Sequence, residues 1–533
     1  MHCRWIPVLF LLGTEAFSAN ETDIKIPEKA DGCYQISSIQ ELFGFASVVN
    51  ETQKNAGEAA TCANLLSDIA WEEGYVWVPL ETFSGIFDGR GHTISGLVSQ
   101  KGGLFAYVNG ESKENPAIIK NIGIVNSELG DFVYAGSIAN ETRGVVLIEN
   151  VYNNSPVYGS FSTGYVGGLV GHQEGDLTIS NSYNSGTVNG AYELGGLVGS
   201  SWGRLTIKNS YNSGNIAGFS SAYGTSFVGG LVGRSHKEAY VYNSYNIGKI
   251  ESGTFSGRAG GIMGEAVDGA LINSYNAGEI IKTGSIYSGL IALRNSSNFV
   301  YENVFSTAAG GFFGTIVSTE LLMNGKVALA LHSYHGRNVD GTIWGQEIGV
   351  DSIPVLGKNM TGNFDDFVVS AINLNTFEGD TVKYVDKYVE GVGTILPTPY
   401  QEGLKFDGWY ATETFEGNSA QRIDASATGD KSFYAKWVDT TLISSSSTDI
   451  ESSSSSEQTT RLAERMIKTF NLSTQGRQLA VTGAGTGIVR IFDSLGHLVA
   501  EQELFGGNTN FVLNSSGRYV VELNGYRKGI NIH

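Results

Sequence analysis

The chain contains few charged residues, little proline and very little cysteine or histidine. Charged residues make up 16% of the 533 residues, and there are only 8 Pro, 8 His and 3 Cys. The 34 Lys and Arg residues are outnumbered by 53 Asp and Glu residues, which gives a formal net charge of −19. Nucleic acids and anionic membrane surfaces favour basic patches, so this balance disfavours both as partners. It is compatible with cations and with neutral polymers.

Long apolar runs are also scarce. Residues 5–12 form an apolar run between a short polar start and the small residues at 16–19, which is typical of a secretory signal peptide at 1–19. A buried first strand or helix is the alternative. No other stretch approaches the ~20 apolar residues that a membrane helix needs. We therefore expect a protein without a transmembrane segment that is secreted or located at the outer cell surface.

The chemistry of cysteine and histidine is limited. Beyond the predicted signal peptide only Cys33 and Cys62 remain, and they form either one disulfide or two free buried thiols. His332 and His335 are the only closely spaced histidines, but no glutamate follows His332 and no third ligand completes a zinc motif. The sequence also lacks a P-loop, a Gly-x-Ser-x-Gly elbow and a His-Glu-x-x-His motif. We therefore expect no metal site and no cofactor.

What the chain does have is a repeat. An asparagine recurs at intervals of 28 to 34 residues, and most copies continue as Asn-Ser-Tyr-Asn. These first-column asparagines are Asn121, Asn150, Asn181, Asn209, Asn243, Asn273 and Asn303. A second phrase, Gly-Leu-Val-Gly or a close variant, precedes four of them at 168–171, 196–199, 230–233 and 261–264. A fixed period in this range predicts a solenoid, in which each repeat stacks on the next.

The repeats predict short strands rather than helices. The 71 Gly residues lack a collagen period and fit tight turns, and no helical period of useful length separates the phrases. We predict an all-β protein whose main domain, at 101–356, is a right-handed parallel β-helix-like solenoid of ~30-residue repeats. An N-terminal cap and lead-in region precedes it at 20–100. We expect there a helix at 38–49 that covers the open end of the solenoid, and a strand–turn–strand at 83–97.

The C-terminal part of the chain changes character. Strand patterns without the glycine phrase predict a separate domain at 357–437. Runs of serine at 444–447 and 452–456 then predict a flexible linker at 438–460. Alternating apolar and polar residues predict a small antiparallel β-sandwich of six or seven strands at 461–533.

Three parts of the chain resemble known families. The paired phrases over residues 80–310 resemble the GLUG motif family of bacterial secreted and surface proteins. Residues 365–437, with Phe-Asp-Gly-Trp-Tyr at 406–410, resemble a Listeria–Bacteroides (internalin B-type) repeat, which implies a β-grasp-like module found on cell-surface proteins. Residues 470–533, with Gly-Arg-Tyr-Val-Val at 517–521, are similar to the C-terminal sorting domains of type IX-secreted proteins. Some GLUG-bearing proteins are metallopeptidases, but the missing His-Glu-x-x-His motif prevents that activity from carrying over.

Two side-chain columns follow from the repeat. A tyrosine lies two residues after most first-column asparagines, at Tyr152, Tyr183, Tyr211, Tyr245 and Tyr275. Strand alternation places each tyrosine on the same face as its asparagine. The column is either an internal aromatic stack beside an asparagine ladder or an exposed strip on which sugar rings stack. The second-column asparagines are Asn153, Asn184, Asn212, Asn246 and Asn276. We predict that they form corner turns, because Asn tolerates the left-handed conformation, with a ligand-contacting ridge as the alternative.

Four carboxylates lie in predicted turns between the strands, at Asp176, Glu193, Glu265 and Asp268. A glycosidase or lyase needs carboxylates, or a carboxylate-bound Ca²⁺, at a defined separation. Nothing in the sequence sets such a separation or specifies a Ca²⁺ ion, so solvated turn charges are expected. We therefore favour a non-catalytic adhesion or recognition protein that binds a polysaccharide, a surface glycan or another surface protein. The alternatives are a β-helix polysaccharide lyase or hydrolase, and a passive surface spacer.

Overall fold

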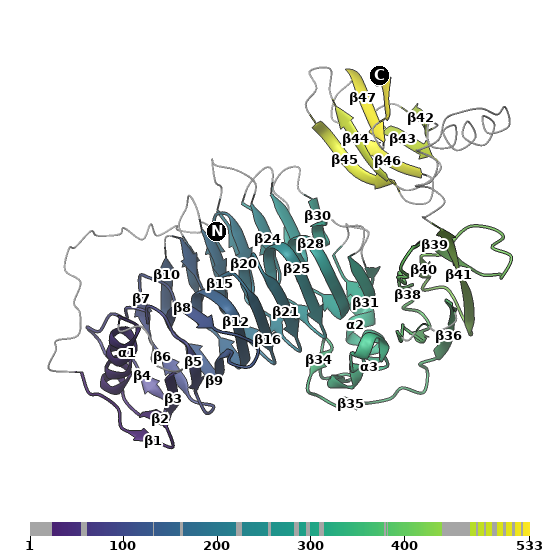
Figure 1. The fold of residues 1–533 in the computed structure, drawn as a ribbon. Helices are drawn as coiled ribbons and strands as arrows, with labels where there is room; N and C mark the ends of the chain where they lie inside the picture. The colour runs from purple at the N-terminus through teal and green to yellow at the C-terminus, as the bar shows by residue number, and fades with distance from the viewer. Residues whose placement is uncertain are drawn as a thin grey trace, which may run out of the picture. The chain divides into compact units, whose positions relative to one another are not determined.

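The computed structural model describes most of the chain from residue 24 onward (Figure 1). The residues outside the description are 1–23, 55–60, 132, 160–163, 220–225, 254–256, 282–286, 295–298, 309–313, 378–379, 381, 440–469, 476–477, 484–486, 493–497, 505–507, 514–516, 524–525 and 533. The predicted signal peptide and nearly all of the predicted serine-rich linker therefore lie outside it. The chain divides into two compact units, Met1–Thr440 and Thr441–His533, which are taken separately below.

The first unit is dominated by a β-solenoid of about eight coils (Figure 1). Equivalent strands of consecutive coils pair in parallel, as Val170, Val198 and Val232 do. The strands that contain all or the second half of the glycine phrase are β15 (Val170–Gln173), β20 (Val198–Ser201), β25 (Val232–Tyr242) and the long β28 (Arg258–Asn276). A separate sheet stacks β7 (Val98–Ser99), β10 (Glu128–Asp131), β13 (Val157–Gly159), β18 (Val188–Gly190), β23 (Ile216–Gly218), β27 (Ile250–Glu251) and β29 (Ile280–Ile281). The leucines of the phrase lie fully buried in the interior, which confirms the predicted fold class.

The parallel pairing begins earlier than residue 101. Strand β2 (Cys33–Ile36) already pairs with β3 (Thr61–Leu65), and a disulfide joins Cys33 to Cys62 across this first pair, with 4.5 Å between the Cα atoms. The predicted strand–turn–strand at 83–97 does not close on itself. Its strands β5 (Gly85–Asp88) and β6 (Thr93–Ser95) pair instead with neighbouring coils, because they are successive sides of one coil.

The predicted capping helix is present as α1 (Ile39–Lys54). Ser38 caps it, since its hydroxyl accepts a hydrogen bond from the Glu41 amide at 3.2 Å. The buried Phe45 ring contacts the rings of Phe83 and Phe87 at centroid distances of 6.3 and 6.1 Å. The helix therefore covers apolar side chains that the first coils would otherwise expose.

The solenoid stops before the predicted limit of residue 356. Its last parallel pair joins β31 (Val300–Ser306) to β32 (Thr315–Ile316), and the short helices α2 (Thr319–Met323) and α3 (Lys326–His332) follow. The carbonyls at the C-terminal end of α3 accept hydrogen bonds from the last two first-column amides, at 3.1 Å for Asn273 and 3.0 Å for Asn303. Free helix carbonyls thus provide acceptors for the end of the asparagine column.

The first-column asparagines form the predicted ladder and also take the corner role that the sequence assigns to the second column. Five of their side chains donate to the preceding first-column Oδ1 at 2.7–3.4 Å: Asn150, Asn209, Asn243, Asn273 and Asn303. The first-column asparagines have left-handed φ values from 45° to 55° and form the corners. The second-column asparagines do not have this conformation and are fully buried. In the inner ladder, the second-column Nδ2 atoms of Asn153, Asn184, Asn212 and Asn246 each donate to the Oδ1 of the next asparagine at 2.8 Å. The predicted corner turn at the second column is therefore wrong.

The glycine phrase and the inner ladder depend on each other. The Asn212 amide donates its second hydrogen to the Gly214 carbonyl at 2.8 Å, so both of its hydrogens are bonded. A Cβ added at Gly196 would lie 2.4 Å from the Asn212 Cγ and 2.1 Å from the Gly230 carbonyl oxygen. Only glycine leaves room for the buried amide opposite it.

Residues 357–437 form a mixed sheet after the solenoid. It consists of β36 (Val369–Asn375), β37 (Lys387–Val389), β39 (Leu404–Tyr410) and β41 (Lys431–Asp439). The domain also touches the last coil, because the buried Glu302 carboxylate accepts a hydrogen bond from the Val385 amide at 2.7 Å. The same carboxylate binds Arg337, in the segment before the domain, at 2.7 Å.

The second unit is an antiparallel β-sandwich, as predicted. One sheet contains β42 (Phe470–Gln475), β43 (Gln478–Gly483) and β46 (Asn508–Val512), and the other contains β44 (Gly487–Phe492), β45 (Leu498–Leu504), β47 (Gly517–Leu523) and β48 (Tyr526–Ile532). Apolar residues of both sheets, including Val481 and Ile491, share one core.

We predict that Asn212→Ala strongly destabilises the solenoid. It leaves one hydrogen of the buried Asn184 amide without its acceptor, at a cost of roughly 1–3 kcal/mol in the free energy of unfolding. It also removes one of the two donors to the Asn246 Oδ1, which keeps the Gly248 amide at 3.2 Å. The measurement is the denaturant midpoint. Asn209→Gly is the comparison variant, because it loses only longer hydrogen bonds of 3.2 and 3.4 Å at a half-buried corner whose left-handed conformation glycine adopts. Equal midpoints for the two variants would contradict the assigned role of the inner ladder.

We predict that Cys33→Ser weakens only the first coils. The disulfide closes a loop with a sequence separation of 29, and its loss costs about 3 kcal/mol. Because solenoid coils contact only their neighbours, hydrogen exchange should accelerate in β2 and β3 and remain unchanged in β25 and β28. Faster exchange along the whole solenoid would show that the end coils control the stability of all the others.

Candidate functional site

The predicted tyrosine column is a continuous ring stack outside the apolar interior. Adjacent rings from Tyr152 to Tyr275 lie 4.8–5.1 Å apart and within 9° of parallel. Tyr152, Tyr183 and Tyr211 are half-buried, whereas Tyr245 and Tyr275 are covered by the ring of Trp344. The ring faces contact each other, so the half-buried members offer a ligand their edges and hydroxyls rather than a stacking surface.

One shallow hollow lies at the N-terminal end of this stack. It has a volume of about 420 Å³ and is lined by Asp88, Arg90, Gly91, Asn121, Asn150 and Tyr152. Its carboxylate is already engaged, because Asp88 accepts hydrogen bonds from the Asn121 side chain at 2.9 Å and from the Arg90 amide at 2.8 Å.

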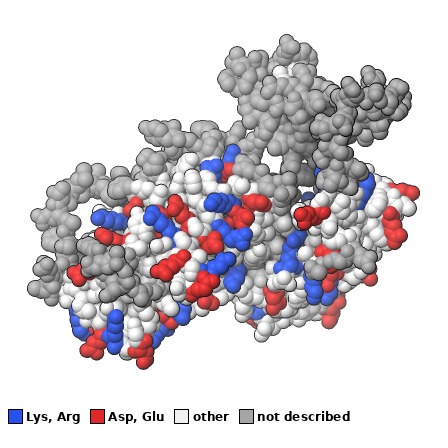
Figure 2. All heavy atoms as spheres, viewed as in Figure 1, with Lys and Arg blue, Asp and Glu red and all other residues white. Residues whose placement is uncertain are grey.

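A richer surface borders the glycine phrase. The positions three residues before and one residue after the phrase form two neighbouring columns, kept in register by the parallel strands. Together with two nearby side chains, Trp202 in the turn after β20 and His236 in β25, these columns make up the aromatic–carboxylate face. Its column residues are Tyr134, Tyr165, Glu193, Phe227 and Arg258 in the first column and Glu141, His172, Ser200, Arg234 and Glu265 in the second. Figure 2 shows acidic and basic side chains intermixed on the visible face of the solenoid.

Three carboxylates of this face are buried: Glu141, Glu193 and Glu265. Glu193 is 0% exposed, and its Oε1 lies 3.4 Å from both Arg234 Nη1 and His236 Nε2. Its Oε2 has no hydrogen-bond partner among the described residues. Glu265 is 2% exposed and contacts Arg258 at 2.5 Å and Arg234 at 3.3 Å. Buried carboxylates normally have full sets of partners, so the unpartnered oxygen of Glu193 marks this location as a candidate site.

The predicted turn carboxylates therefore divide into two pairs. Glu193 and Glu265 are strand residues on either side of one guanidinium, so the expectation of solvated turn charges is wrong for them. Asp176 and Asp268 are half-buried and line a neighbouring hollow of about 430 Å³, together with His236.

Aromatic rings surround the buried charges. Trp202 is 46% exposed, its ring lies 4.3 Å from that of His236, and its Nε1 donates to Ser200 at 3.1 Å. The Phe227 ring lies between two guanidinium groups, at 4.2 Å from Arg234 and 5.0 Å from Arg258. The face thus combines an exposed ring, cations and a buried acceptor.

Tyr165 presents a protonated hydroxyl in this face. Burial, helped by the nearby Glu193 carboxylate, raises the pKa of Tyr165 to about 12. Its hydroxyl therefore stays protonated near neutral pH, which makes it a poor general base.

The histidine pair of the sequence does not assemble a site. The His332 Nδ1 lies 2.7 Å from the Trp344 carbonyl oxygen, and the exposed His335 lies 3.8 Å from Asp340. Sequence reasoning missed His172 and Arg234. Both directly follow a glycine phrase, and that constant offset within the repeat was the available signal.

One family model and one solved structure are similar to parts of this chain. The model of the GLUG motif matches residues 162–189, which run from just before β14 (Tyr165–Gly167) into β18 (Val188–Gly190). No curated protein matches the chain. A solved structure titled IgA1 Protease is 21% identical over 53% of this chain, with a TM-score of 0.37, and the match covers 22% of that protein. No helix within the described ranges is long and apolar enough to cross a membrane. The GLUG motif and the β-solenoid fit a surface or secreted β-helix protein.

Proposed function

We propose that this chain is an exported, non-catalytic recognition protein that binds polysaccharide or surface glycan through the aromatic–carboxylate face. The observation that supports this most is the buried Glu193 carboxylate, whose Oε2 lacks a partner among the described residues. His236 contacts both Glu193 and the exposed ring of Trp202. A sugar offers hydroxyl donors for such an oxygen and an apolar ring face for such an indole.

The rigid scaffold suits recognition of a long polymer. The two columns of the face continue over at least four coils in register, so equivalent positions recur along the solenoid. Short polymer segments can then contact several coils at once. Because the scaffold is already ordered, each contact adds binding free energy without a further loss of conformational entropy in the protein.

The C-terminal modules support export to a surface. From the sequence resemblances, we assign the 357–437 domain to the internalin B-type repeats and the 461–533 sandwich to the type IX sorting domains. Another surface protein is the alternative partner, because the same carboxylates and aromatic rings also suit a protein ligand.

We predict that the chain is retained by at least one member of a panel of insoluble polysaccharides without releasing new sugar ends. Trp202→Ala and Glu193→Gln should each weaken retention about tenfold, because they remove the exposed ring and the buried acceptor. Retention and reducing-end release are measured on the same samples.

Tyr158→Ala is the matched control, because Tyr158 is also 46% exposed but lies on β13 (Val157–Gly159) in the seven-stranded sheet. Its retention should equal that of the unmodified chain. Release of sugar ends would favour the lyase or hydrolase alternative. Unaltered retention in both site variants would reject this face as the binding site.

A further inference from the structure

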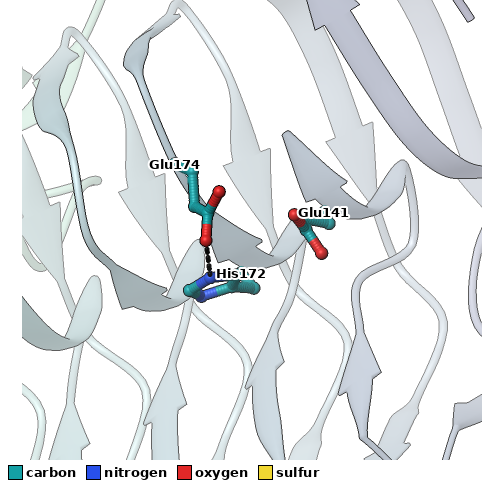
Figure 3. A group of neighbouring side chains, drawn as sticks. All are labelled: Glu141, His172 and Glu174. Carbon is teal, nitrogen blue, oxygen red and sulfur yellow. Dashed lines mark ion pairs between the residues drawn. The ribbon is translucent and has the colours of Figure 1, made fainter. Parts of the chain in front are cut away.

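A second constellation lies at the N-terminal end of the same face. Glu141 in β12 (Ala139–Asn153) is in register with His172 of the next coil, and Glu174 follows two residues later (Figure 3). One potential ligand atom from each of the three side chains lies within 4.8 Å of the other two. The His172 Nε2 and a Glu174 carboxylate oxygen are 3.6 Å apart.

His172 lacks the partners that a buried imidazole normally has. The residue is 4% exposed, and its Nδ1 has no hydrogen-bond partner among the described residues. The contact to Glu174 is longer than a hydrogen bond. Two carboxylates and an imidazole thus lie close together, yet the His172 imidazole forms no hydrogen bond within the described residues. Buried imidazoles are normally hydrogen-bonded.

We propose that Glu141, His172 and Glu174 bind a divalent transition-metal ion, with Zn²⁺ as the expected occupant. One imidazole nitrogen and two carboxylate oxygens are donors that Zn²⁺ accepts at about 2.0–2.2 Å. Ca²⁺ instead favours six to eight oxygen ligands, so the imidazole disfavours it. Three protein ligands leave one position open for water.

The surroundings hold the imidazole in place. The ring of Tyr134 stacks against the His172 ring at a centroid distance of 4.7 Å and restrains its orientation. Glu174 is exposed, so its side chain can move the short distance that coordination requires.

The positive charge of Arg143 disfavours metal binding at this cluster. Its Nε forms an ion pair with the Oε1 of Glu141, so a positive charge already lies beside one ligand. The second oxygen of Glu141 remains for coordination. Because Arg143 is exposed and also lies 4.7 Å above the Tyr107 ring, its removal should leave the coil intact. Substitution of Arg143 should therefore strengthen metal binding, whereas substitution of a ligand should weaken it.

The test is calorimetric titration of the metal-free full chain with Zn²⁺, with Mn²⁺ and Ca²⁺ in parallel. We expect one Zn²⁺ per chain, at least about tenfold weaker binding for His172→Ala and Glu174→Gln, and tighter binding for Arg143→Gln. His335→Ala is the control, because that exposed histidine lies outside the cluster and should bind Zn²⁺ like the unmodified chain.

Glu174→Gln keeps the proposal testable if His172→Ala fails to fold, since Glu174 is exposed. The proposal fails if the chain binds no Zn²⁺, or if the His172 and Glu174 variants bind it as tightly as the unmodified chain. Tighter Ca²⁺ than Zn²⁺ binding that is lost in Glu174→Gln would overturn the choice of metal. The result does not depend on glycan binding, because no polysaccharide is present.

Discussion

The buried asparagine ladder is the interaction on which the rest of the structure depends. Each amide from Asn153 to Asn246 donates to the asparagine of the next coil, and its second hydrogen reaches a carbonyl two residues further along. A buried amide is tolerated only when its hydrogens are bonded, so each coil requires its neighbour. Glycines lie opposite the amides of Asn184, Asn212, Asn246 and Asn276 and leave them the necessary space, which explains why the two repeated phrases occur together.

Because the phrase residues and the ladder hold the coils together, the positions that flank the phrase are available for chemistry. The phrase residues face inward or bond from coil to coil, whereas the positions that flank the phrase take no part in the ladder. Glutamate, histidine, arginine and aromatic residues gather there, and parallel register brings them into contact across coils. The contact between Glu193 and Arg234 joins residues 41 apart in the chain. A regular scaffold can therefore hold an irregular and highly polar surface.

The helix at 38–49, the solenoid and the C-terminal sandwich could be predicted from the sequence, because each depends on a local residue pattern or a repeat period. The corner was assigned to the wrong column because Asn tolerates left-handed geometry at either position. The glycines two residues after the second column, such as Gly214, serve close packing rather than a positive φ. Glu193 was assigned to a turn for a related reason. Its burial depends on register with other coils, which no local window contains.

In the proposed binding mode, ligands contact the positions flanking the glycine phrase and not the tyrosine stack. Hydrogen–deuterium exchange of the full chain, with and without a polysaccharide that retains it, distinguishes these two surfaces. We expect added protection in β15, β20 and β19 (Glu193–Gly195), with no change in β17 (Tyr183–Asn184) and β22 (Tyr211–Asn212). Protection confined to β17 and β22 would contradict it and return the binding site to the tyrosine column.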